Sequence, residues 1–518
     1  TMGVRAALGF DINDDWSATI SALYQEQDGN GASAYDPTLG TLEAVRFTPE
    51  TSEDEIFQFA AVIEGSLGDV ADIVYAGSYF KRDFFERNDY TLYSDTWAAY
   101  YAYDPVSYTY FSAPMDYTDT SEWTRNTHEI RISSQDNGSK LSWLVGLFYD
   151  DTEHKYDYLY TVPTLTTTWG FTGLFASKTP VDPTVWWESL NVRKDEQLAL
   201  FGEVSYDITD QLTATVGART FKNEYSVSLN HGYGGAFQPE AGGDDEQDTV
   251  WKASLSYQAT EDVLLWFTWS QGYRQGGFNR NPNAFPGYPN VFDSDTVDSY
   301  EIGAKTEWFD NRLRLNGAIL YMDWSDTQVS SFDYSCDAAA MPPDLNCAPL
   351  GWAENLDGGI EVMGAEMDFV ADLSDNLSIN GGMSYIDKAE SQGDYYVSAG
   401  RNAPAGTAMP LIPEFKFNTS IRYDWEVANG LDAFGQVTYT YVDEMWNELT
   451  TVSRSRQDSY SITNLRLGVG NDRWTGEFFI DNIADEQAEI FINNFNFDNR
   501  IETNRPRTIG FKLKARFN

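Results

Sequence analysis

The chain has 518 residues, and its 80 acidic residues against 34 basic ones give a formal net charge of −46. This charge excludes nucleic-acid binding through a general basic surface. Hydrophobic residues make up 42%, enough for a folded protein, but no apolar run is long enough for a membrane-spanning helix. The N-terminal residues show no signal-peptide pattern, which indicates either a removed signal or a longer parent chain.

Strict alternation of apolar and polar residues is the dominant pattern from residues 2–11 to the C-terminus. It is clearest in 376–385, 415–425 and 508–517. A period of two predicts strands with one apolar and one polar face, and we count roughly nineteen segments of about 10 to 15 residues. In 415–425 the apolar set is expected to face lipid and the polar set to face a lumen. The two sets are Phe415, Phe417, Ile421 and Tyr423, and Lys416, Asn418 and Arg422.

The connections between these segments alternate between short and long. Short turns are predicted near residues 13–15, 66–69, 136–138, 209–210, 260–261, 310–311, 374–375, 428–430 and 471–472. Long connections are predicted at 27–53, 86–122, 159–193, 226–247, 276–297, 331–357, 389–412, 446–458 and 483–503. One rim with turns and one with large loops is typical of a transmembrane antiparallel β-barrel, with short periplasmic turns and long extracellular loops. A sandwich or a propeller has no reason for this asymmetry.

Tryptophans and charged residues are also unevenly placed. Tryptophans near the short turns predict an interfacial girdle: Trp16, Trp143, Trp251, Trp308, Trp425 and Trp474. Basic residues are expected on lumen-facing positions: Arg219, Arg312, Arg314, Arg422 and Arg466. Acidic residues concentrate in the long loops: Asp95, Asp104, Asp116, Asp244, Asp245, Glu246, Asp333, Asp337 and Asp344. Solvation explains these acids, and a bound divalent cation is the alternative; no other cofactor and no metal site is predicted.

The only two cysteines are Cys336 and Cys347, in a polar, proline-containing loop. We expect a local disulfide formed in an oxidising compartment, with chance proximity as the alternative. A zinc site would need further ligands nearby, and the three histidines lie far away in sequence.

Several segments, in order along the chain, resemble the barrel of the TonB-dependent receptors of Gram-negative outer membranes. The most specific is Gly-Tyr-Arg-Gln-Gly-Gly-Phe-Asn at 272–279. The others are 128–133 with 143–149, 201–207 with 217–219, 300–305 with 311–313, 481–485, and 505–517, where Asn518 follows the usual terminal aromatic. The resemblance implies a barrel of about 22 strands closed by an N-terminal plug. Strand parity then assigns residues 1–518 to one domain that contains the fourth to the twenty-second strand of the barrel. The plug, the TonB box and about the first three strands are not in this chain.

The resemblance implies a function in the outer membrane of a Gram-negative bacterium. The receptor would capture a scarce ligand and import it with energy from the TonB complex, which acts through the missing N-terminal region. Expected partners are outer-membrane lipid, lipopolysaccharide and a ligand such as a siderophore, haem, cobalamin or an oligosaccharide. A passive porin of about sixteen to eighteen strands and a barrel for surface-polymer insertion are the alternatives. No enzyme activity is predicted, because no nucleophile elbow or phosphate-binding loop occurs.

A ligand site is expected on the long-loop rim, where the loops at 86–122 and 159–193 are rich in aromatic residues. Aromatic faces beside carboxylates suit stacked sugars or neutral apolar ligands, whereas the acidic surroundings disfavour anionic ferric complexes. Packing of loop on loop is the alternative. Arg274 is expected at the mouth of the lumen, where it would bind ligand or, as we favour, dock onto the plug. The candidate residues are Trp97, Tyr100, Tyr101, Tyr103, Trp169, Trp186, Trp187, Arg274 and Asn279.

Overall fold

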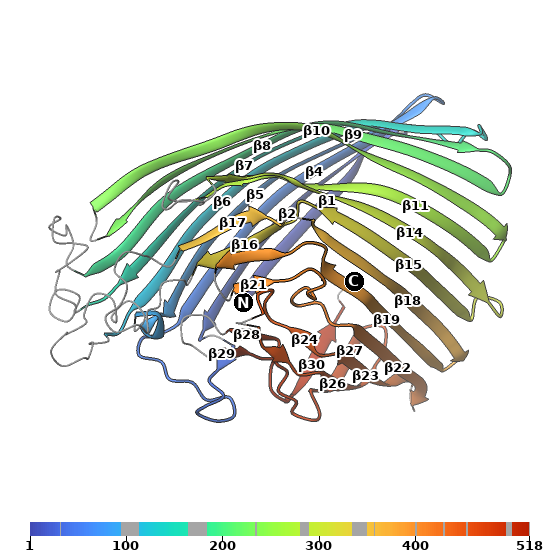
Figure 1. Ribbon diagram of the computed structural model, residues 1–518. Helices are drawn as coiled ribbons and strands as arrows, with labels where there is room; N and C mark the ends of the chain where they lie inside the picture. The colour runs from blue at the N-terminus through green and yellow to red at the C-terminus, as the bar shows by residue number, and fades with distance from the viewer. Residues whose placement is uncertain are drawn as a thin grey trace, which may run out of the picture.

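A computed structural model describes the chain except residues 32, 95–112, 164–183, 234–235, 280–289, 334–349, 357, 399–400, 428–429, 452–453, 494–499 and 517–518. Nineteen strands form one antiparallel sheet that curves into a barrel wall (Figure 1). They are β1 (Met2–Asn13), β2 (Trp16–Asn30), β4 (Thr51–Leu67), β5 (Ala71–Asp89), β6 (Asp116–Ser134), β7 (Leu141–Thr161), β8 (Val185–Asp207), β9 (Leu212–Tyr233), β10 (Ala236–Thr260), β11 (Val263–Arg274), β14 (Asp295–Trp308), β15 (Leu313–Ser325), β18 (Ile360–Ser374), β19 (Leu377–Ser391), β22 (Phe415–Val427), β23 (Leu431–Val442), β26 (Tyr460–Gly470), β27 (Trp474–Asp481) and β30 (Thr508–Ala515).

Smaller strands belong to the connections at the long-loop rim. They are β3 (Ala34–Tyr35), β12 (Gly277–Phe278), β13 (Val291–Phe292), β16 (Gln328–Asp333), β17 (Leu350–Asn355), β20 (Tyr395–Ser398), β21 (Arg401–Ala403), β24 (Met445–Trp446), β25 (Arg456–Gln457), β28 (Phe491–Asn493) and β29 (Arg500–Glu502). In the part of the chain that the structure describes, no helix is long and apolar enough to cross a membrane.

The predicted alternation of short and long connections is present. Short turns join β1 to β2, β4 to β5, β6 to β7 and so on to β26 and β27, and they lie along one rim, at the right in Figure 1. The longer connections lie along the other rim, with one exception. Residues 226–247 do not form a long loop, because β9 and β10 pair without interruption from Tyr233 and Ala236 down to Leu212 and Tyr257. Two adjacent glycines and a run of acidic residues hid the alternation in this segment.

The wall is much taller on one side than on the other. The four strands β7 to β10 have 21, 23, 22 and 25 residues, whereas β26, β27 and β30 have 11, 8 and 8. About 10 tilted residues are enough to cross a bilayer. The tall strands therefore extend well beyond the membrane on the long-loop side.

The two faces of the sheet differ as the alternation predicts. On β22, Ile421 and Tyr423 are 45% and 50% exposed, and Ile421 lies beside Ile379 of the next strand. Lys416 and Asn418, on the opposite face, line a hollow of about 630 Å³ on the inner surface. Contact with lipid explains why the outer side chains are apolar although no protein covers them. The predicted orientation of β22 is therefore confirmed.

The tryptophan girdle is present with one correction. Five of the six predicted tryptophans lie on the outer face at the short-turn ends of strands: Trp16, Trp143, Trp308, Trp425 and Trp474. Trp251 also faces outward and is 48% exposed, but it lies in the middle of β10 because that strand continues to Thr260. It therefore contacts lipid rather than marking the periplasmic boundary.

The connections beside β1 and β30 are tied together at the long-loop rim. Strand β29 pairs with β3, although they lie near opposite ends of the sequence. The Arg500 guanidinium lies 3.7 Å from the carboxylate of Glu50, which is almost fully buried, and donates to the carbonyl oxygen of Asp89. Among the described residues β1 pairs only with β2, and β30 only with β27. The two edge strands are thus linked through their loops and not through each other.

Candidate aromatic binding site

The inner face of the tall strands carries a row of aromatic side chains. On β7, His154, Tyr156, Tyr158 and Tyr160 follow one another at every second position, so all four point to the same side of the sheet. That side is the lumen, because the alternate positions carry the exposed apolar residues of the outer face, such as Leu147. The neighbouring strand β6 places further rings beside them.

These rings form a continuous series of contacts, which we call the inner aromatic wall. His154 stacks between two rings, with centroid distances of 4.0 Å to Trp123 and 4.5 Å to Tyr156. The series continues from Tyr156 to Tyr158 at 5.4 Å and from there to Tyr117 at 5.9 Å. Tyr160 completes the wall, 4.9 Å from Tyr117. All six side chains remain partly exposed, so a flat ligand group can stack against the exposed part of this wall.

Two arginines lie at the lower edge of this wall. The Arg82 guanidinium lies 5.1 Å from the ring centre of Trp123 and forms two hydrogen bonds with Asp54. Arg193, which pairs with His154 in the sheet register, lies 5.7 Å from the ring of Tyr225. Asp195 accepts two-pronged hydrogen bonds from Arg193. Each cation is therefore neutralised by its own carboxylate, and Asp119 and Glu86 add negative charge beside Tyr117.

Of the predicted site residues, Trp186 and Trp187 lie next to this wall. Trp186 is only 3% exposed and packs with Ala113, Met115 and Val162, so it supports the loops and is not available for stacking. Trp187 remains partly exposed, 5.6 Å from Tyr160. The other aromatic residues predicted for these loops lie outside the described residues: Trp97, Tyr100, Tyr101, Tyr103 and Trp169.

Arg274 lies at the outer end of β11, as predicted. Its carboxylate partner belongs to a neighbouring strand of the barrel and not to a plug. Asp295, the first residue of β14, is 1% exposed and accepts hydrogen bonds from Arg274 Nε at 3.0 Å and from the Gln328 backbone N–H at 2.8 Å. The guanidinium also lies 5.0 Å from the ring centre of Trp324. Arg274 therefore joins β11, β14 and the β16–β17 hairpin.

Asn279 has a related role a few residues further on. Its side-chain amide donates to the carbonyl oxygen of Ala353 at 2.8 Å and its oxygen accepts from the Ala353 N–H at 2.8 Å. This double hydrogen bond fixes β12 to β17. A Cβ atom at position 277 would lie 2.2 Å from the tip of the Phe292 ring, so any larger residue there would displace that ring. The segment most characteristic of the predicted family thus serves to hold the small hairpins against the wall.

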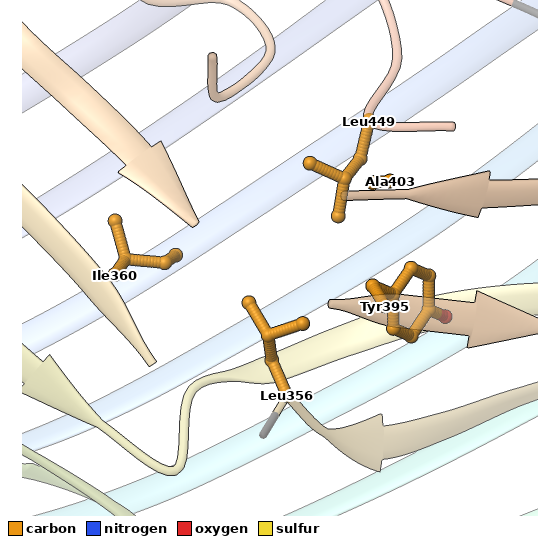
Figure 2. Packing of buried hydrophobic residues seen from close by; sticks show 5 residues of the cluster. All are labelled: Leu356, Ile360, Tyr395, Ala403 and Leu449. Atoms are coloured by element: carbon orange, nitrogen blue, oxygen red, sulfur yellow. The ribbon is translucent and has the colours of Figure 1, made fainter. Parts of the chain in front are cut away.

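A second buried cluster joins the hairpins on the lower side of the mouth (Figure 2). Leu356, Ile360, Tyr395, Ala403 and Leu449 come from four different connections or strand ends and pack together. Burial and the nearby Glu354 carboxylate raise the pKa of Tyr395, so its hydroxyl stays protonated at physiological pH. The cluster joins the hairpins to one another and to the start of β18.

Metal binding finds no support in the described part of the chain. No group of three or more His, Cys, Asp or Glu side chains there is arranged to hold an ion. Asp244 and Glu246 belong to β10 and not to a loop. Cys336 and Cys347, together with four of the predicted loop acids (Asp95, Asp104, Asp337 and Asp344), lie outside the described residues.

The sequence analysis missed Trp123, His154, Tyr156, Arg82 and Arg193. It assigned 86–122 and 159–193 to loops and expected the site there, whereas all of these residues except Arg193 lie outside those two ranges. A signal was present, because His154 and the three tyrosines after it occupy every second position. Their polar neighbours, Lys155 and Asp157, face outward above the membrane and therefore do not look like lipid-facing residues.

These features define a large outer-membrane β-barrel with a structured extracellular mouth. A family model described as "TonB dependent receptor-like, beta-barrel" matches residues 70–483. The chain therefore belongs to the TonB-dependent receptor family, whose members are outer-membrane receptors of Gram-negative bacteria and not enzymes.

Individual relatives are distant. The pesticin receptor of Yersinia enterocolitica is 24% identical over 212 residues, which are 40% of this chain and 28% of the relative. The structure of the ferric yersiniabactin uptake receptor FyuA from Yersinia pestis aligns with a TM-score of 0.75 at 15% identity, over 99% of this chain and 70% of that one. The siderophore receptor PiuA from Acinetobacter baumannii gives 0.70 at 15% identity, over 99% and 73%. At such identities the structures establish a common fold only.

Proposed function

We propose that this barrel belongs to an active-uptake receptor whose ligand is a ferric chelate of low net charge that carries aromatic rings. The inner aromatic wall is the observation that supports this proposal, because its rings offer stacking area and its arginines are already neutralised by Asp54 and Asp195. The chain's net charge of −46 disfavours strongly anionic complexes. The names of FyuA and PiuA, which refer to ferric or siderophore uptake, agree with an iron-bearing ligand.

We further propose that import depends on the TonB complex and on a plug and about three strands supplied by the rest of the full-length receptor. Strand direction supports this. β1 ends at a short turn, and β30 begins after a long connection, so both run toward the short-turn rim. Two strands that run in the same direction cannot close an antiparallel barrel, whereas an odd number of strands between them can.

The ligand class can be tested with three probes on the purified receptor. Ferric tris(benzohydroxamate) is neutral and aromatic, ferric tris(catecholate) is aromatic and trianionic, and maltotriose is an uncharged sugar. Quenching of tryptophan fluorescence should show the tightest binding for the neutral aromatic chelate. Tighter binding of maltotriose would contradict the proposal and favour a carbohydrate ligand.

Removing two rings of the wall should weaken this binding strongly. In the Trp123→Ala/Tyr156→Ala variant we expect the Kd for ferric tris(benzohydroxamate) to rise about tenfold or more, since each stacked ring contributes roughly 1 kcal/mol. Isothermal titration calorimetry measures this change. Tyr149→Ala is the matched control, because Tyr149 lies on β7 with its side chain on the outer face. Equal affinities of the two variants would show that the wall is not the site.

A further inference from the structure

Strand β10 extends far beyond its neighbour on one side. It pairs with β9 from Ala236 to Tyr257, but with β11 only from Lys252 to Thr260. Among the described residues, no other strand pairs with β10 above Lys252 on this side. The segment 241–251 therefore has an unpaired edge, which we call the open edge of β10.

The open edge lies outside the membrane. It starts about ten residues above Thr260, the short-turn end of β10, and about ten tilted residues are enough to cross a bilayer. Ala241, Gly243, Asp245 and Gln247 are all exposed. A molecule in the medium can thus reach this edge from the extracellular side.

The chain that follows β11 does not continue beside β10 but lies against its lumen side. Glu246 points to the lumen, because the odd-numbered Trp251 of the same strand points outward. The Tyr273 hydroxyl donates to Glu246, and the Tyr273 ring lies 4.7 Å from the ring of Phe221. Ser294 donates to the other carboxylate oxygen of Glu246 at 2.6 Å. These contacts cover part of the inner face of β10 and leave its edge uncovered.

The backbone groups of every second residue point toward the open edge. Gln258, at an even-numbered position, donates its N–H to the carbonyl oxygen of Gln211 at 2.8 Å, on the β9 side. Because β9 and β10 pair without a bulge, the odd-numbered residues of β10 point their N–H and C=O groups to the other side. Pro239 occupies an odd-numbered position, where its missing N–H costs no bond to β9. The N–H donors of the open edge belong to Ala241, Gly243, Asp245, Gln247 and Thr249.

Acidic side chains control access to these donors. Asp244 Oδ1 accepts from the Asp245 N–H at 2.9 Å, and Asp248 Oδ1 accepts from the Thr249 N–H at 2.6 Å. The segment 241–251 contains four acidic residues and no Lys, Arg or His. Two copies of the chain paired edge to edge would bring these carboxylates against one another, and the repulsion disfavours that pairing. The charge instead favours a partner strand with basic side chains.

We propose that the open edge of β10 binds an extended lysine- or arginine-rich segment of another protein, which adds to the barrel wall as a further strand. Main-chain hydrogen bonds to Ala241, Gly243 and Gln247 hold the added strand. Its cations pair with the carboxylates of Asp244 and Asp248 and release the two N–H groups that these carboxylates occupy. A neutral or acidic segment cannot release them, which makes the edge selective for a basic partner.

Two synthetic probes separate strand addition from simple charge attraction. Both are peptides of about ten alternating lysine and threonine residues, long enough to span the open edge. In the second peptide every backbone nitrogen is methylated, so it has the same charge but no N–H donor. Fluorescence anisotropy with the full-length receptor in detergent measures both affinities. We expect the methylated peptide to bind at least about tenfold more weakly, since each lost hydrogen bond contributes roughly fivefold. Hydrogen exchange in 241–251 should slow only with the unmethylated peptide.

Matched variants change one property of the edge at a time. Gln247→Pro removes one edge N–H, whereas Gln247→Ala removes the same side chain and keeps the N–H. We expect the first to weaken binding of the unmethylated peptide at least about fivefold and the second to leave it unchanged. Asp244→Asn/Asp248→Asn should weaken it about tenfold, at roughly threefold for each surface ion pair. Its control, Asp151→Asn/Glu196→Gln, removes two paired carboxylates from β7 and β8 and should have no effect.

Equal affinities of the two peptides, or of the Gln247→Pro and Gln247→Ala variants, would overturn the proposal, because they would show attraction by charge without an added strand. A wild-type dimer in native mass spectrometry that Gln247→Pro lacks would also overturn it and assign the edge to a second copy. Heat-modifiable migration on gels confirms that every variant is folded. None of these measurements involves the imported ligand, so the result is independent of the proposed uptake function.

Discussion

Replacing Ile421 by arginine should destabilise the barrel by about 2–4 kcal/mol, the cost of a cation on the lipid face near the bilayer midplane. Ile421 lies in the middle of β22 and is 45% exposed on the outer face, between Ile379 and Val437 of the neighbouring strands. The arginine side chain of the variant would have to extend to water across the outer face, which is apolar both above and below this position. Urea unfolding of the receptor in liposomes measures this loss directly.

The control for this prediction lies three residues away on the same strand. Asn418 lines the inner hollow with Lys416, so the Asn418→Arg side chain enters a polar and hydrated space. We expect a change below about 1 kcal/mol for this variant, because a lumen substitution alters polarity without placing a charge in lipid. If both variants lose the same stability, the assignment of the two faces of β22 is incorrect.

Replacing Arg274 by alanine should cost about 3 kcal/mol at the junction of β11, β14 and β16. The Asp295 carboxylate is 1% exposed, and without Arg274 it would keep the Gln328 N–H as its remaining donor from this junction. Removing one partner of a buried ion pair leaves an uncompensated charge, which typically costs about 3–5 kcal/mol. We take the lower end because the Arg274 side chain itself is half exposed. Urea unfolding and hydrogen exchange of β16 measure the global and the local effect.

The matched control is Arg312→Ala, which removes an ion pair of the opposite kind. Arg312 lies in a short turn and contacts Asp375, whose side chain is 88% exposed. Such a surface pair contributes less than about 1 kcal/mol. Adding Asp295→Asn to Arg274→Ala should recover part of the lost stability, because it removes the buried charge. An Arg274→Ala variant as stable as Arg312→Ala would show that the junction does not depend on this pair.

The sequence predicted the membrane-spanning part of the barrel far better than the strand ends and connections at its extracellular opening. Wherever one face of a strand contacts lipid, the alternation is strict, as in β22, and the register follows from it. The short turns could be located for the same reason, because they lie between two strictly alternating segments. Above the membrane both faces of β7 to β10 meet water or protein, so selection for an apolar outer face ends and the alternation fades. Strand ends and the upper part of the β9–β10 hairpin, residues 226–247, were therefore assigned to loops.

The candidate site was missed because ligand-binding residues were expected mainly on the long loops and not on the strands. The prediction placed its aromatic candidates on the loops at 86–122 and 159–193, whereas Trp123 and Tyr156 lie on the strands β6 and β7. For Arg274 the expected position was found, but its partner Asp295 is 21 residues away in sequence. Such pairs depend on strand register and on how the chain returns to the wall, which one sequence does not specify.

The unequal height of the wall sets the direction from which a molecule can reach the mouth. The difference of 17 residues between β10, with 25, and the short strands β27 and β30, with 8 each, corresponds to roughly 40 Å along the barrel axis. The opening is therefore inclined, and it faces sideways along the cell surface as much as outward. A solute that enters over the low side meets the inner face of the tall strands, where the rings of Trp123 and Tyr156 point toward it. A solute that approaches over the low side therefore has a shorter path to these rings than one that must cross the top of the tall strands.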